Sequence, residues 1–110
     1  MKASFWTALI VVAAFVCLYG LNVAVADEKG LSGAAEFKTH CDVCHHDGGN
    51  IINPKKTLHK ADREANKVKT AADIIKLMRN PGPGMTKFDE KTIPDSEAKK
   101  IADYVLKAFK

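Results

Sequence analysis

The chain has 110 residues, of which 46% are hydrophobic and 27% are charged, and its formal net charge is +4. This length holds a single domain, and so small a net charge argues against the large basic surface that would indicate a nucleic-acid partner. A domain of this size forms a thin core, so it usually needs disulfides, a metal or a cofactor for stability.

The first 26 residues have the features of an export signal. Lys2 precedes an almost wholly apolar run over residues 5–21, and Ala24-Val25-Ala26 matches the small-residue pattern that signal peptidase accepts. We therefore expect a signal peptide over residues 1–26, a domain over residues 27–110 and a periplasmic location. Cleavage after Ala26 would leave a net charge of +3, because it removes one base and no acid.

Two alternatives to a cleaved signal stay open. The apolar run approaches the ~20 residues that span a bilayer, so an uncleaved segment would anchor the protein in a membrane. In a lipoprotein Cys17 would carry the lipid, but Val16 stands directly before it, where a lipid-attachment site normally has a small residue. Cleavage remains the favoured interpretation.

The rest of the chain predicts helices joined by turns. Apolar residues recur at helical spacing in two segments, and Thr70 with Asp73 forms a possible capping box at the start of one of them. Glycine and proline mark loops over residues 47–54 and 81–85. No polar–apolar alternation of useful length indicates a strand, so the predicted fold class is all-α. The expected helices cover 31–40, 60–67, 70–79 and a last helix from Asp95, a candidate N-cap.

The strongest motif is Cys41-Asp42-Val43-Cys44-His45, the C-x-x-C-H pattern of c-type haem attachment. Cysteines three residues apart lie about one helical turn from each other, so both sulfurs can bond the two vinyl groups on one porphyrin edge. The next residue, His45, can then reach the iron as the proximal ligand. A redox C-x-x-C, a zinc site and a structural disulfide are the alternatives. A redox C-x-x-C would be expected in a βαβ context, which this sequence lacks. A zinc site would usually need a second pair of cysteines, and beyond residue 26 the sequence has no cysteine besides the two of the motif.

With this motif in place, the segment after residue 26 resembles the class I cytochromes c. Gly33 and Phe37 lie eight and four residues before Cys41, like the glycine and the aromatic of that family's first helix, and Tyr104 resembles the aromatic of its last helix. The resemblance implies three to five helices around one haem, with the N- and C-terminal helices crossing. The short separation of His45 from residue 85 is similar to small monohaem members, including those of metal-reducing bacteria.

Met85 is the expected distal ligand of the iron. It follows Pro81-Gly82-Pro83-Gly84, which cannot form regular structure, and the family places its methionine in a similar proline-containing loop. Met78 continues a helical apolar stripe, so core packing explains it better. A bis-histidine site through His59 is the chief rival coordination.

Other candidate residues surround the motif. His40 and His46 stand too close to it in sequence to reach the opposite face of the same haem. Pro54 is similar to the family proline whose carbonyl orients the proximal histidine. Arg63 and Arg79 are possible partners of the haem propionates, although a solvated surface position is the usual outcome for such residues.

Two axial ligands would leave the iron no free position for a substrate, so we expect a one-electron carrier and not an enzyme. Its partners would be redox proteins that dock briefly near the haem edge, and we expect a monomer. The alternatives are a five-coordinate haem sensor or peroxidase, and the haem subunit of a membrane-bound respiratory complex.

Overall fold

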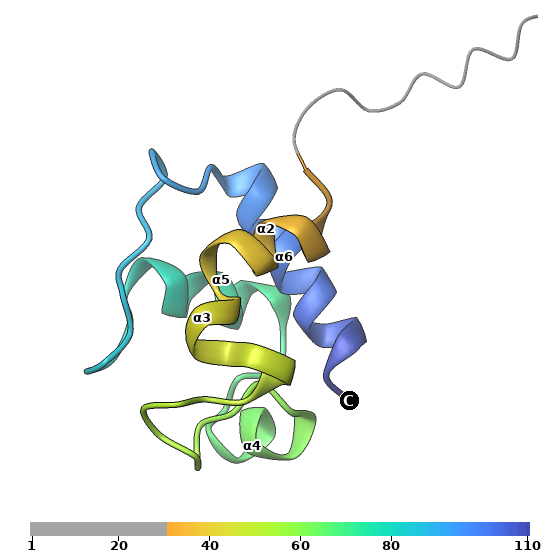
Figure 1. The fold of residues 1–110 in the computed structure, drawn as a ribbon, viewed down its shortest axis with the longest axis vertical. Helices are drawn as coiled ribbons and strands as arrows, with labels where there is room; N and C mark the ends of the chain where they lie inside the picture. The colour runs from red at the N-terminus through yellow and green to blue at the C-terminus, as the bar shows by residue number, and fades with distance from the viewer. Residues whose placement is uncertain (1–30) are drawn as a thin grey trace, which may run out of the picture.

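The computed structural model describes residues 31–110 (Figure 1). The expected signal peptide, Cys17 and the proposed cleavage site lie outside these residues, so they stay predictions. Within the described part the chain is helical and contains no strand, which confirms the all-α class. The elements are α2 (Gly33–His40), α3 (Asp42–His45), the 3₁₀ helix η1 (His46–Gly48), α4 (Lys60–Ala65), α5 (Ala71–Arg79) and α6 (Asp95–Ala108).

Helices α2 and α6 cross in close contact, as the family resemblance implies (Figure 1). A Cβ atom built on Gly33 would lie 2.2 Å from the carbonyl oxygen of Lys100, so only glycine allows this approach. The Phe37 and Tyr104 rings pack beside the crossing with their centroids 5.3 Å apart. The Phe109 ring lies 5.4 Å from Phe37 and extends the aromatic cluster.

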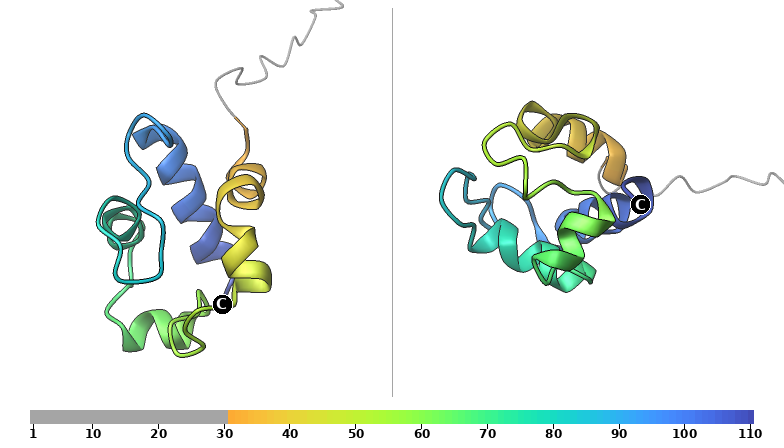
Figure 2. Two further views of the ribbon diagram at one scale, coloured as in Figure 1. Left: turned by 60° about the vertical axis from the view of Figure 1, so that its left-hand side comes forward. Right: turned by 90° about the horizontal axis from the view of Figure 1, so that it is seen from below.

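Helix α5 begins at the predicted capping box. The Thr70 hydroxyl accepts from the Asp73 amide, and the Asp73 carboxylate accepts from the Thr70 amide, which satisfies two of the free amides at the helix start. The helix packs against α6, and Figure 2 shows α6 lying between α2 and α5. Ile74 and Met78 are buried in the core.

The start of α6 differs from the prediction. Pro94 occupies the N-cap position, and Asp95 is the first helical residue. The Asp95 carboxylate does not cap the helix, and it accepts a hydrogen bond from Arg79 at 2.7 Å. An acidic side chain in this first turn still interacts favourably with the helix dipole.

The core lies where α2, α5 and α6 meet. Two of its members are alanines of α6, whose small side chains let the helices approach closely. The buried apolar residues are Phe37, Ile74, Met78, Ile93, Ala98, Ile101, Ala102 and Val105. Within residues 31–110, no helix is both long enough and apolar enough to cross a bilayer.

Candidate haem site

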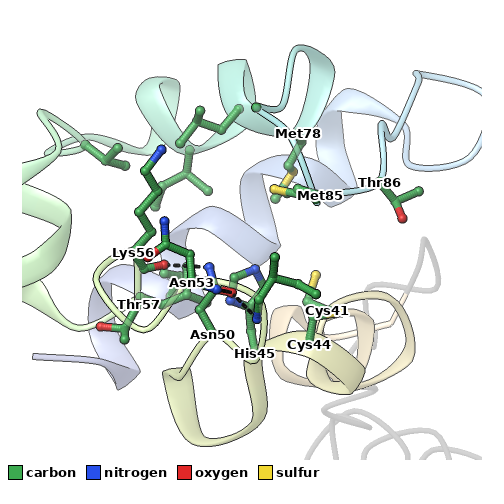
Figure 3. A pocket seen from close by; sticks show the side chains of 18 of the residues that line it. Cys41, Cys44, His45, Asn50, Asn53, Lys56, Thr57, Met78, Met85 and Thr86 are labelled. Atoms are coloured by element: carbon green, nitrogen blue, oxygen red, sulfur yellow. Dashed lines mark hydrogen bonds between the residues drawn. The ribbon is translucent and has the colours of Figure 1, made fainter.

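A cavity of about 310 Å³ opens between the segment around α3, helix α5 and the loop before Met85. Its lining includes Cys41, Cys44, His45 and Met85, the four residues that the sequence predicts for haem binding. Figure 3 shows Met85 across the cavity from the two cysteines and His45. The fold therefore brings residues 40 positions apart to facing walls of one space.

The two cysteines form no disulfide with each other, and both line the cavity from the α3 side. The amides of Cys44 and His45 both donate to the carbonyl of Cys41, at 3.2 and 2.9 Å, so a single tight turn presents the motif. Burial, together with the nearby negative charge of Glu36, raises the pKa of Cys41 to about 11. Cys41 is consequently a neutral thiol at physiological pH.

The orientation of His45 is fixed by its own loop. Its Nδ1 lies 2.7 Å from the carbonyl oxygen of Gly49, and a carbonyl only accepts, so Nδ1 carries the proton. The neutral Nε2 keeps its lone pair for a metal. This arrangement corrects the role predicted for Pro54, which is exposed and does not line the cavity. The loop turns back at Gly48 and Gly49, before the chain reaches Pro54.

Both methionines line the cavity, but their surroundings differ. Met78 is 3% exposed and belongs to the core, whereas Met85 is 36% exposed and lies in an irregular loop. The Met85 amide donates to the carbonyl of Gly82, and Gly84 takes a φ of 90°, which glycine tolerates without strain. The loop thus holds Met85 without enclosing it in the core.

The remaining histidines have other interaction partners. His59 does not line the cavity, and its ring packs against Phe109 with centroids 5.9 Å apart. His40 also lines the cavity, but its Nε2 lies 3.3 Å from the buried carboxylate of Glu36. His46 is exposed, and its hydrogen bond to Asp42 raises its pKa. Within the described part of the chain, His45 is therefore the imidazole best placed for iron.

The rim of the cavity is apolar although it faces solvent. Val43 is 80% exposed, Ile52 60% and Leu77 39%, and all three line the cavity. Apolar side chains gathered at one exposed opening indicate a surface that a ligand covers. A flat apolar ring system such as haem would cover them, so the residues fit the predicted cofactor.

One end of the cavity is polar. Figure 3 shows Lys56 and Thr57 at the end away from Cys41 and Cys44. Haem has this polarity too, since its two carboxylates lie on the edge opposite the vinyl groups. Asn50, Asn53, Asp62, Arg63 and Asn66 also line the cavity.

Comparison with known proteins agrees with this geometry. Residues 28–105 match the family model described as cytochrome c oxidase, cbb3-type, subunit III. The chain is 34% identical to cytochrome c6 of Cyanidium caldarium over 99 residues, which are 89% of each chain. The chain belongs to the monohaem class I cytochromes c. Like its cytochrome c6 relatives, this cytochrome is an electron carrier and not an enzyme.

Other relatives extend the comparison. Cytochrome c6 of Synechocystis is 42% identical over 85 residues, which are 77% of this cytochrome and 69% of the relative. The solved structure of OmcF, an outer-membrane cytochrome of Geobacter sulfurreducens, is 48% identical with a TM-score of 0.70. It covers 72% of this cytochrome, which in turn covers the whole of that structure. The family implies a covalently attached haem.

Sequence reasoning missed two functional groups. The partner of His45 is the backbone carbonyl of Gly49, which no side-chain pattern reveals. Arg63 is 5% exposed and lines the cavity, although the sequence favoured a solvated position for it.

Proposed function

We propose that Cys41 and Cys44 hold one haem through two thioether bonds and that His45 and Met85 are the axial ligands of its iron. The observation that carries the proposal is the placement of both thiols, the imidazole and the thioether around one cavity with an apolar rim. Bound haem would supply the Fe(III)/Fe(II) couple.

Each side chain would have a separate role in holding the haem. The two cysteines fix the position of the ring, and Gly49 holds the His45 imidazole in the tautomer that can ligate a metal. Met85 would supply a thioether on the opposite side, which would raise the reduction potential relative to a second histidine. Two protein ligands would leave substrates and gases no open coordination site.

Electron transfer then requires contact with other redox proteins. We propose transient docking at the exposed edge of the haem, where a small interface would suffice for rapid exchange. A monomer fits such a role. The export signal expected over residues 1–26 and the similarity to an outer-membrane cytochrome support a periplasmic location, with membrane association if the segment is retained.

Exposure of the reduced protein to carbon monoxide tests the carrier function against a sensor or peroxidase. An iron with two protein ligands should show little change in its absorption spectrum on a timescale of minutes. Met85→Ala, which removes one ligand, should bind carbon monoxide at once and serves as the positive control. Immediate binding by the wild-type protein would indicate an open site and would contradict the proposed coordination.

A further inference from the structure

Arg63 is a buried cation without an anionic partner. It belongs to α4 and is 5% exposed. Its Nε donates to the carbonyl of Leu58 at 2.7 Å, and its Nη2 donates to the carbonyl of Phe109 at 3.3 Å. None of the ion pairs found among residues 31–110 includes Arg63. Because burying an unpaired charge costs free energy, an anion bound beside this guanidinium would stabilise the protein.

The guanidinium keeps one nitrogen without a hydrogen bond to a described residue. Nη1 makes no such bond, and it is not fully buried, because none of the fully buried side-chain nitrogens and oxygens in residues 31–110 lacks a partner. Arg63 lines the cavity, so the cavity is where a ligand could meet this group. A ligand there would complete the hydrogen bonds of the guanidinium.

The neighbouring charges do not supply the missing anion. Asp62 also lines the cavity, but its carboxylate accepts a hydrogen bond from the Thr57 hydroxyl and forms no ion pair with Arg63. Lys56 adds a second positive charge at this end, because it precedes Thr57, the residue that hydrogen-bonds to Asp62 beside Arg63. This end lies away from the cysteines in Figure 3, so it faces the edge of the ring that carries the propionates.

We propose that Arg63 binds a haem propionate from inside the fold and thereby raises the reduction potential of the iron. The inference rests on the proposed haem site. A positive charge close to the ring favours the ferrous state, which carries one positive charge less than the ferric state. Replacement of Arg63 by an uncharged side chain should consequently favour the ferric state.

The test measures the midpoint potential of haem-loaded Arg63→Met at neutral pH. We expect the one-electron equilibrium to shift about tenfold toward the ferric state, which is about 59 mV. Arg63→Lys keeps the charge and should stay closer to wild type. An unchanged potential in a folded, haem-loaded Arg63→Met protein would overturn the inference, while the proposed haem site would stand.

Arg79→Met is the matched control. Arg79 also donates to a carbonyl, that of Phe88 at 3.0 Å, but its charge is paired with Asp95 and it does not line the cavity. The control should leave the potential close to wild type. A drop equal to that of Arg63→Met would show a general effect of removing charge and would overturn the specific role of Arg63.

A second measurement needs no variant, in case Arg63→Met fails to fold. In the reduced, diamagnetic wild-type protein, nuclear Overhauser contacts should connect the Arg63 side-chain protons with the methylene protons of a propionate. Their absence from a spectrum that resolves both groups would contradict the pairing. A protein without haem would instead disprove the proposed function from which this inference starts.

Discussion

At the scale of single residues, the two methionines of the cavity give the clearest contrast. Met85→Ala should abolish the weak long-wavelength absorption of a methionine–iron bond, because Met85 is the expected ligand. Met78→Leu should keep that absorption, since it exchanges buried residues of similar volume at a cost of less than about 1.5 kcal/mol. Optical spectra of both oxidised variants measure the difference.

The opposite pattern would reverse the assignment. If the absorption persisted in Met85→Ala and vanished in Met78→Leu, Met78 would be the ligand and the loop methionine would only cover the ring. Both side chains line the cavity, so the spectra decide between them.

Residue types revealed the attachment site but not its supporting contacts. The pattern Cys41-Asp42-Val43-Cys44-His45 is a property of side chains, and the structure places all of its haem-binding members at one cavity. The hydrogen bond from His45 to Gly49 uses a backbone carbonyl, so only the folded path of the loop reveals it. The burial of Arg63 could not be predicted from its neighbours alone. Its guanidinium donates to the carbonyl of Leu58, five residues earlier, and to that of Phe109, 46 residues later.

At the scale of elements, the crossing of α2 and α6 depends on one glycine. Gly33→Ala should destabilise the protein by at least the ~1–3 kcal/mol typical of overpacking, because its new Cβ would meet the rigid backbone of Lys100. Gly82→Ala is the matched control, since a Cβ there meets nothing within 4 Å. Chemical denaturation of both variants measures the cost.

Equal stability of Gly33→Ala and wild type would mean that the two helices can separate without loss. The close contact at Lys100 would then not determine how they pack, and the role given to Gly33 would be wrong.

The capping box of α5 predicts a dependence on acid. Hydrogen bonds from the amides of Lys69 and Thr70 hold the pKa of Asp73 below its ordinary value of 3.8. A lowered pKa in the folded state stabilises the protein above the ordinary value, and this contribution is lost as pH falls through the folded pKa. The stability difference between wild type and Asp73→Asn should therefore shrink on acidification below pH 3.8.

Denaturation of both proteins at several pH values measures this difference. A difference that stayed constant, or that grew in acid, would contradict the role of the charged carboxylate. Thr70→Ala tests the other half of the box and should cost about 1 kcal/mol at neutral pH.

Helix positions were more predictable than helix ends. The apolar stripes that predicted segments 70–79 and the last helix correspond to α5 and α6, whose buried faces include Ile74, Ile101 and Val105. The N-cap lies one residue before the predicted position, because Pro94 takes the extended conformation before the helix; the Asp95 carboxylate pairs instead with Arg79 of α5. Such long-range pairing is invisible in local patterns.

At the scale of the whole molecule, the balance of charges predicts weak electrostatic steering. Residues 27–110 carry a net charge of +3, and two ionised propionates would lower it to about +1. The rate of electron exchange with an anionic oxidant such as hexacyanoferrate should consequently fall only mildly as ionic strength rises. Stopped-flow kinetics over a series of salt concentrations give the slope, and a steep fall would indicate a concentrated basic patch instead.

The central claim is that one haem is covalently attached to Cys41 and Cys44. Intact mass spectrometry of the denatured protein, purified from a cell that attaches c-type haem, tests it most directly. We predict the mass of the polypeptide plus one haem, and the bare polypeptide mass for the double variant Cys41→Ala, Cys44→Ala. A wild-type protein with the mass of the polypeptide alone and two free thiols would contradict the account.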